Sequence, residues 1–132
     1  MRLLTSALLA ITLCACAPQG TAEPPQAPPT FGPGLVMVYT YPTEGASFRV
    51  EVLEGQTLRF EGVAGPPQGF KGSTTYRVVD IAPGVVLINW GEDGGVLMTM
   101  VVDLADGQVH AREVRDGKLR ALDGTLEVES AP

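Results

Sequence analysis

From residue 35 onward, apolar residues either alternate with polar ones or form short unbroken runs, and both patterns are typical of β-strands. Alternation is clearest from Phe48 to Leu53, where charged side chains separate the apolar ones. The runs are rich in β-branched and aromatic residues, which favour strands. We expect strands at 35–41, 47–53, 57–63, 74–82, 85–91, 96–104, 108–114 and 118–128, the last as one strand or two short pieces.

Short turn signals separate these segments. Four Asp-Gly pairs, at 93–94, 106–107, 116–117 and 123–124, lie between the runs, and glycine accepts the positive φ that a tight hairpin turn needs. Such short connections make consecutive strands antiparallel neighbours. The one longer gap, 64–73, contains two prolines and three glycines, and we expect a mobile loop or lid there.

The runs 85–90 and 96–102 are apolar on both faces, so we expect them where the sheet is covered on both sides. About eight antiparallel strands with short turns predict an all-β fold, a small up-and-down barrel whose closure removes exposed strand edges. A barrel of this size is either filled by its own side chains or holds one small ligand. A sandwich of two sheets is the alternative fold.

The first 34 residues have a different composition. An apolar run at 3–13 resembles a secretory signal and is too short to span a bilayer. The sequence Leu-Cys-Ala-Cys at 13–16 resembles the bacterial lipoprotein box, which implies lipidation of Cys16; an ordinary signal peptide is the alternative. Six prolines in 17–34 predict an extended tether. We expect a signal peptide at 1–15, a lipidated cysteine and Pro-rich linker at 16–34, and a barrel domain at 35–132.

Charge and composition exclude several classes of function. The chain has 9 Lys+Arg and 15 Asp+Glu, a net charge of -6, so it lacks the clustered basic residues that nucleic-acid binding needs. Its 16 Gly and 11 Pro argue against a helical bundle. His110 is the only histidine, and we expect it at the surface. With Cys16 committed to lipid, neither a zinc site nor a Cys–His pair can be assembled, and the sequence implies no cofactor.

Several short motifs resemble those of known families. Residues 37–41, Met-Val-Tyr-Thr-Tyr, are followed by an acidic-Gly turn and an amphipathic strand, and they resemble the opening of bacterial phenolic acid decarboxylases. Residues 76–85 and the Asn-Trp-Gly-Glu of 89–92 look like the middle of these enzymes. The MoaF-like proteins share this pattern, and the Leu-Asp-Gly-Thr-Leu of 122–126 is similar to their final strand. The resemblance implies a lipocalin-like (calycin) barrel.

The resemblance also implies candidate site residues. In the decarboxylases, two tyrosines and an arginine hold the ends of a para-hydroxycinnamate, and a glutamate handles the proton. Tyr39 and Tyr41 match the tyrosines by position, and Glu92, two residues after Trp90, matches the glutamate. Where the family has its arginine, at 65–72, this chain has only Lys71, a point charge rather than a planar fork for a carboxylate.

Glu92 is therefore the candidate catalytic residue, and the candidate ligand-binding residues are Tyr39, Tyr41, Trp90, Glu92 and Lys71. Side chains two apart on a strand share a face, so inward-facing tyrosines and an inward-facing Trp90 and Glu92 would place two phenols, an indole and a carboxyl in one cavity. The alternative is that the aromatic residues only fill the barrel and that Glu92 is a solvated turn residue.

Three hypotheses on function follow. The first is a bacterial envelope lipoprotein, anchored in a membrane through Cys16, whose barrel binds a small apolar or aromatic molecule; with two membranes, we expect it on the periplasmic side of the outer one. The second is a lyase that uses Glu92 with Tyr39 and Tyr41, against which the missing arginine argues. The third is an accessory envelope protein whose barrel is filled and that binds only other proteins.

Overall fold

A computed structural model describes residue 24 and residues 26–132, so the expected signal peptide and Cys16 lie outside the described residues. The described chain is almost entirely β, with one short 3-10 turn, η1 (Pro42–Glu44). No helix within this part is long and apolar enough to cross a membrane. Its nine strands are β1 (Val36–Tyr41), β2 (Ala46–Leu53), β3 (Thr57–Ala64), β4 (Lys71–Thr75), β5 (Arg77–Ala82), β6 (Val85–Glu92), β7 (Val96–Asp103), β8 (Gln108–Arg115) and β9 (Lys118–Ser130).

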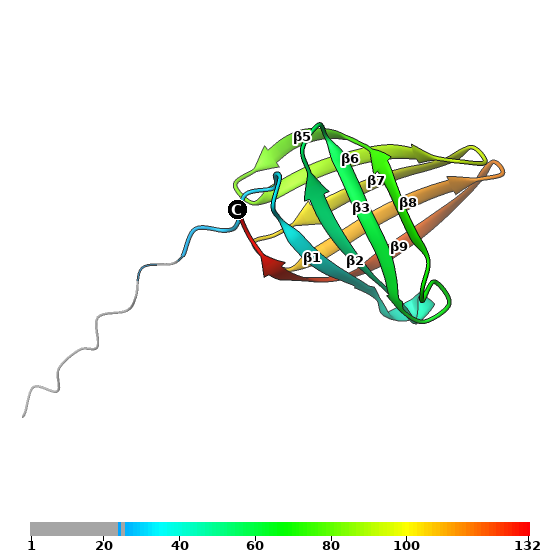
Figure 1. Ribbon diagram of the computed structural model, residues 1–132, viewed down its shortest axis with the longest axis horizontal. Helices are drawn as coiled ribbons and strands as arrows, with labels where there is room; N and C mark the ends of the chain where they lie inside the picture. Colours follow the sequence, from blue (N-terminus) through cyan, green and yellow to red (C-terminus); the bar gives the residue numbers. More distant parts are fainter. Residues whose placement is uncertain (1–23, 25) are drawn as a thin grey trace, which may run out of the picture.

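All nine strands belong to one antiparallel sheet in the order β4-β3-β2-β1-β9-β8-β7-β6-β5. Strands consecutive in the chain pair with each other, except that β1 pairs with β9 and that β4 and β5 form the two edges. Figure 1 shows the sheet curling on itself, with the C-terminus beside the start of β1. The expected all-β antiparallel fold is thus confirmed, with nine strands instead of eight.

The extra strand comes from the segment expected as one strand at 74–82. Tyr76 interrupts it: its side chain is buried, and its N–H donates to the Gln56 carbonyl at 2.9 Å. The residues before Tyr76 pair with β3, from Glu61 opposite Lys71 to Thr57 opposite Thr75. The loop expected at 64–73 is therefore shorter, because β4 already begins at Lys71.

The barrel is not closed by backbone pairing. At its seam, β4 lies beside β6, where the Thr74 hydroxyl donates to the Gly91 carbonyl at 3.1 Å. No strand pairing joins β4 to β5 or β6 in the described part of the chain. The sheet is consequently a curled, partly closed barrel with one seam.

One of the four Asp-Gly pairs does not form a turn. The pair 123–124 lies inside β9, whereas the other three lie in the connections that join β6, β7 and β8 to the next strand. A Cβ placed on Gly124 would lie 2.1 Å from the Thr40 carbonyl oxygen. Glycine at this position therefore allows β9 to approach β1 closely.

Strand alternation sends one set of side chains into the barrel. At one end, which we call the filled end, aliphatic side chains are buried and pack together: Leu35, Met37, Val52, Ile88, Val102 and Val109. Phe31, from the Pro-rich segment, adds to this end by packing edge-on against Tyr76 at 5.7 Å between ring centroids. The last residues of the expected tether thus contact the domain.

The outer surface corrects a further expectation. The runs 85–90 and 96–102 were expected to be covered on both faces, yet Leu97 on β7 is 59% exposed. In 85–90 no residue is exposed, and the outward-facing Val85 and Leu87 are half-buried. The expectation was wrong for 96–102, because an apolar run on two faces reflects strand propensity as well as burial.

Candidate functional site

The opposite end of the barrel, the hollow end, contains a cavity of about 900 Å³. It lies at the end where η1 and the β3–β4, β6–β7 and β8–β9 connections meet, and small residues such as Ala46 and Gly72 are part of its lining. Six of the chain's eight aromatic residues line it: Tyr39, Tyr41, Phe48, Phe60, Phe70 and Trp90. The hollow end is therefore a cavity with aromatic walls, next to the packed aliphatic core of the filled end.

The two tyrosines of β1 both face the cavity, as their spacing predicts. Tyr39 is 3% exposed and Tyr41 is similarly buried, with ring centroids 6.4 Å apart. Burial raises the pKa of each phenol above its usual value, and for Tyr39 the neighbouring Tyr41 adds to the shift. Both phenols thus stay neutral in physiological conditions and can donate hydrogen bonds.

The hydroxyl of Tyr39 has no hydrogen-bond partner in the described structure. Buried polar groups are nearly always paired, because an unpaired one costs about 1–3 kcal/mol. Since Tyr39 lines the cavity, an occupant of the cavity could accept this hydrogen bond.

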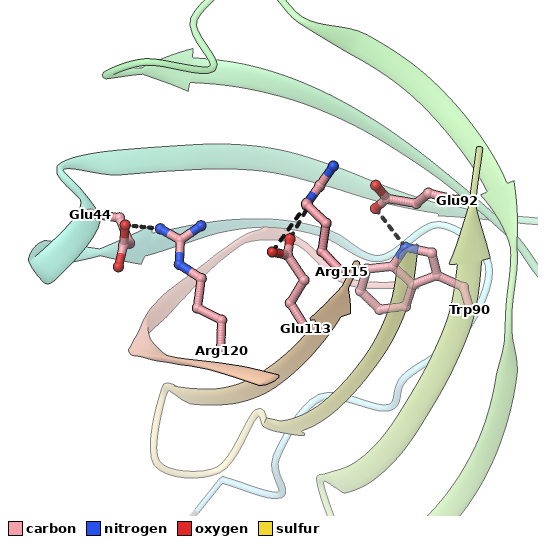
Figure 2. Close-up of polar contacts among 6 residues, drawn as sticks. All are labelled: Glu44, Trp90, Glu92, Glu113, Arg115 and Arg120. Atoms are coloured by element: carbon pink, nitrogen blue, oxygen red, sulfur yellow. Dashed lines mark hydrogen bonds and ion pairs between the residues drawn. The ribbon is translucent and has the colours of Figure 1, made fainter. Parts of the chain in front are cut away.

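Trp90 and Glu92 reach the same cavity from β6. The indole Nε1 of Trp90 donates to Glu92 Oε1 at 3.0 Å, and both side chains are half-buried. This bond holds one carboxylate oxygen and leaves the other available. Figure 2 shows the Glu92 carboxylate beside the Arg115 guanidinium.

The expected cation, Lys71, lies at the rim of the cavity. It is the first residue of β4, not part of a loop, and its Nζ pairs with Glu61 at 3.1 Å while the side chain remains 69% exposed. The structure brings the five candidate site residues to one cavity, but Lys71 is the most peripheral of them.

Two arginines that sequence reasoning missed also line the cavity. Arg115 ends β8 and Arg120 is near the start of β9. Figure 2 shows Arg115 between Glu113 and Glu92, and Arg120 farther away, beside Glu44. Their inward direction follows from strand alternation with Ala111 and Leu122, which are buried. The signal was therefore present in the sequence, in a hairpin far from the position that the family resemblance suggested.

Each of these arginines already has an acidic partner. Arg115 pairs with Glu113 at 3.3 Å, and Arg120 pairs with Glu44 of η1. Hydrogen bonding to Glu113, together with the negative charges of Glu113 and Glu92, raises the pKa of Arg115 above its usual value. The cavity mouth is thus a ring of alternating charge.

The remaining candidate chemistry lies outside the barrel. His110 is exposed on β8, and its Nδ1 is 2.9 Å from Asp123 Oδ1. Hydrogen bonds from His110 and Arg112 lower the pKa of Asp123. Among residue 24 and residues 26–132, no group of three or more His, Cys, Asp or Glu side chains could hold a metal ion.

Comparison with known proteins places this architecture in a family. A crystal structure of a protein from Burkholderia vietnamiensis, provisionally described as a beta-lactamase, superposes with a TM-score of 0.65 at 23% identity, covering 82% of this chain and 99% of that one. This likeness concerns the fold alone. No curated protein matches the sequence. The MoaF-like family matches residues 33–127, and the chain therefore belongs to the MoaF-like family.

Proposed function

We propose that this protein is an envelope-anchored lipoprotein whose calycin-like barrel binds a small apolar or aromatic molecule. The observation that carries the proposal is the Tyr39 hydroxyl, which is buried, unpartnered among the described residues and in the wall of the cavity. A hydrogen-bond acceptor on a ligand would remove the cost of that unpaired group.

The shape and chemistry of the cavity support this proposal. Its volume of about 900 Å³ lies within the range of small-molecule sites, which are mostly apolar with a few polar groups. The aromatic walls supply the apolar surface, and Tyr39, Tyr41 and Glu92 supply the polar groups. A barrel filled by its own side chains, as the accessory-protein hypothesis requires, would have no such space.

Titration with Nile red, a neutral apolar dye, tests the binding proposal. We expect the dye to become fluorescent at one site per chain and to quench Trp90, the only tryptophan, because Trp90 lines the cavity. Native mass spectrometry of protein from its own cells would detect a co-purified molecule. The proposal is contradicted if the dye does not bind and no co-purified molecule is found.

The membrane anchor is tested separately. The Cys16→Ser variant should lose a palmitate-analogue label and move from the membrane fraction to the soluble fraction, because Cys16 is the residue that the lipoprotein box would acylate. A Cys14→Ser variant is the matched control and should keep both the label and the location. Label retained on the Cys16→Ser protein would contradict the anchor.

A decarboxylase-like lyase is the second candidate function. It is favoured by one observation: Glu92, Tyr39 and Tyr41 line the same cavity, and Arg115 and Arg120 provide guanidinium groups from a different position than the family's arginine. Loss of the ultraviolet absorbance of 4-hydroxycinnamate would reveal turnover. The lyase proposal requires that turnover occur and that Glu92→Gln abolish it.

A further inference from the structure

The charged groups at the cavity mouth are not balanced. Seven acidic or basic side chains line the cavity, of which four are acidic and three are basic: Glu44, Glu92, Asp93 and Glu113 against Lys71, Arg115 and Arg120. All three basic side chains are in ion pairs, with Glu61, Glu113 and Glu44 respectively. The cations that an acidic ligand would need are therefore already engaged.

Glu92 is in the opposite situation. No Lys, Arg or His in the described part of the chain forms an ion pair with it. Its Oε1 accepts the indole hydrogen bond of Trp90 at 3.0 Å, which holds the carboxylate at the N–H edge of the indole. Figure 2 shows Arg115 as the nearest drawn cation, and that guanidinium is paired with Glu113. The excess charge of the mouth is thus negative and includes Glu92.

The aromatic lining, like the carboxylate of Glu92, attracts cations. A cation over the face of a tryptophan, tyrosine or phenylalanine is attracted by the negative face of the ring, most strongly by tryptophan. Trp90, Tyr39 and Tyr41 line one cavity with Glu92. An anion would meet arginines whose charge is already compensated by Glu44 or Glu113, whereas a cation would meet Glu92, which forms no ion pair in the described part of the chain.

We propose that the cavity selects a small aromatic ammonium ion, with the ammonium group at Glu92 and the ring among the aromatic walls. This selectivity rests on the proposed binding function and specifies the charge of the ligand. The Tyr39 hydroxyl then donates to an acceptor on the ring, such as a phenol oxygen. The net charge of -6 of the whole chain favours the approach of the same class of ligand.

Three probes that share a 4-substituted phenol ring and differ in charge test this proposal. Tyramine is a cation near neutral pH, tyrosol is its neutral alcohol, and 4-hydroxyphenylacetate is an anion; all three have a phenol oxygen for Tyr39. Isothermal titration calorimetry with the full chain should give tyramine an affinity about tenfold or more above that of tyrosol. The acid should bind most weakly.

Two variants assign the selectivity to one residue. Glu92→Gln keeps the shape and the hydrogen-bond acceptor for Trp90 but removes the charge, so tyramine should lose about tenfold in affinity while tyrosol changes by about twofold at most. The control variant, Glu54→Gln, removes an equal charge from the β2–β3 turn. Glu54 is exposed and does not line the cavity. This control should change neither affinity.

The outcomes separate this inference from the binding proposal. If 4-hydroxyphenylacetate binds as tightly as tyramine, or if Glu92→Gln leaves the preference intact, the inference is wrong while the cavity remains a binding site. If Nile red binds and none of the three probes does, the cavity does not recognise this cation and the inference is also wrong. If Nile red and all three probes fail, both proposals are wrong.

Discussion

The two ends of this barrel are built from the same strands but differ in what their inward side chains do. On β1, Met37 is fully buried among the aliphatic residues of the filled end, and Tyr39, two residues later, leaves a hydroxyl unpaired at the cavity. At the filled end, inward positions maximise apolar contact, which stabilises the fold. At the hollow end, the inward side chains surround a cavity and direct polar groups into it. The packed core and the proposed binding cavity are therefore separated along each strand rather than between different strands.

The largest expected effect comes from truncating two methionines, one at each end. Met37→Ala should lower the free energy of unfolding by about 3 kcal/mol, because it opens a void in a close-packed region. Met98→Ala removes the same atoms from the cavity wall and should cost about 1–2 kcal/mol, since the side chain already borders empty space. Urea unfolding measures both values. Equal losses would mean that the two ends are packed alike.

The buried tyrosines give the hollow end its own pH dependence. Burial raises the pKa of Tyr39 and Tyr41 in the folded protein, whereas unfolded tyrosines ionise near pH 10. The stabilising contribution is therefore fully present below pH 10 and is lost as pH rises further. Two such groups together predict a loss of about 2–3 kcal/mol between pH 9 and pH 11.

The double variant Tyr39→Phe/Tyr41→Phe is the control for this alkaline loss, because it removes the two phenols and leaves every other side chain in place. Urea unfolding at several pH values should show a distinctly shallower decline for the double variant. Parallel declines in the two proteins would indicate that the tyrosines are not responsible.

A smaller effect with the opposite sign is expected for Tyr39→Phe at neutral pH. Removing a buried hydroxyl that has no partner should raise the free energy of unfolding by about 1 kcal/mol, while binding of a phenolic ligand should weaken. Tyr76→Phe, which lies outside the cavity, should change neither by more than about 0.5 kcal/mol. A destabilised Tyr39→Phe protein would show that the hydroxyl has a partner in solution.

The smallest effect is expected on the outer face. Arg49 pairs with Glu129 at 2.7 Å, and both side chains are more than 40% exposed. Because exposed ion pairs contribute about 0–1 kcal/mol, Arg49→Gln should shift the urea midpoint only slightly and leave ligand affinity unchanged. A large loss of stability would show that the outer surface contributes more to the fold than the filled end suggests.

The sequence predicted the features that depend on local pattern. Alternation and turns identified the strands, and two-residue spacing placed Tyr39, Tyr41, Trp90 and Glu92 on inward faces. It missed β4 as a separate strand, because Lys71–Thr75 contains no large apolar residue to indicate it. It also missed Arg115 and Arg120, since the resemblance to the decarboxylases pointed to a cation at 65–72. The curvature that brings these residues to one mouth depends on the whole sheet and cannot be read from any one segment.

The seam at Tyr76 has a consequence for the way the chain could be rearranged. The pairing of β1 with β9 joins the two ends of the domain, where the Ser130 hydroxyl lies 3.4 Å from the Gly34 carbonyl oxygen. A circular permutant that connects Pro132 to Gly34 and opens the chain at Tyr76 would cut no strand pairing. Its strands would run from β5 through β9 and β1 to β4, so every paired strand would follow its partner in sequence. Because folding rates rise as contacts become more local, this permutant should fold faster into the same barrel.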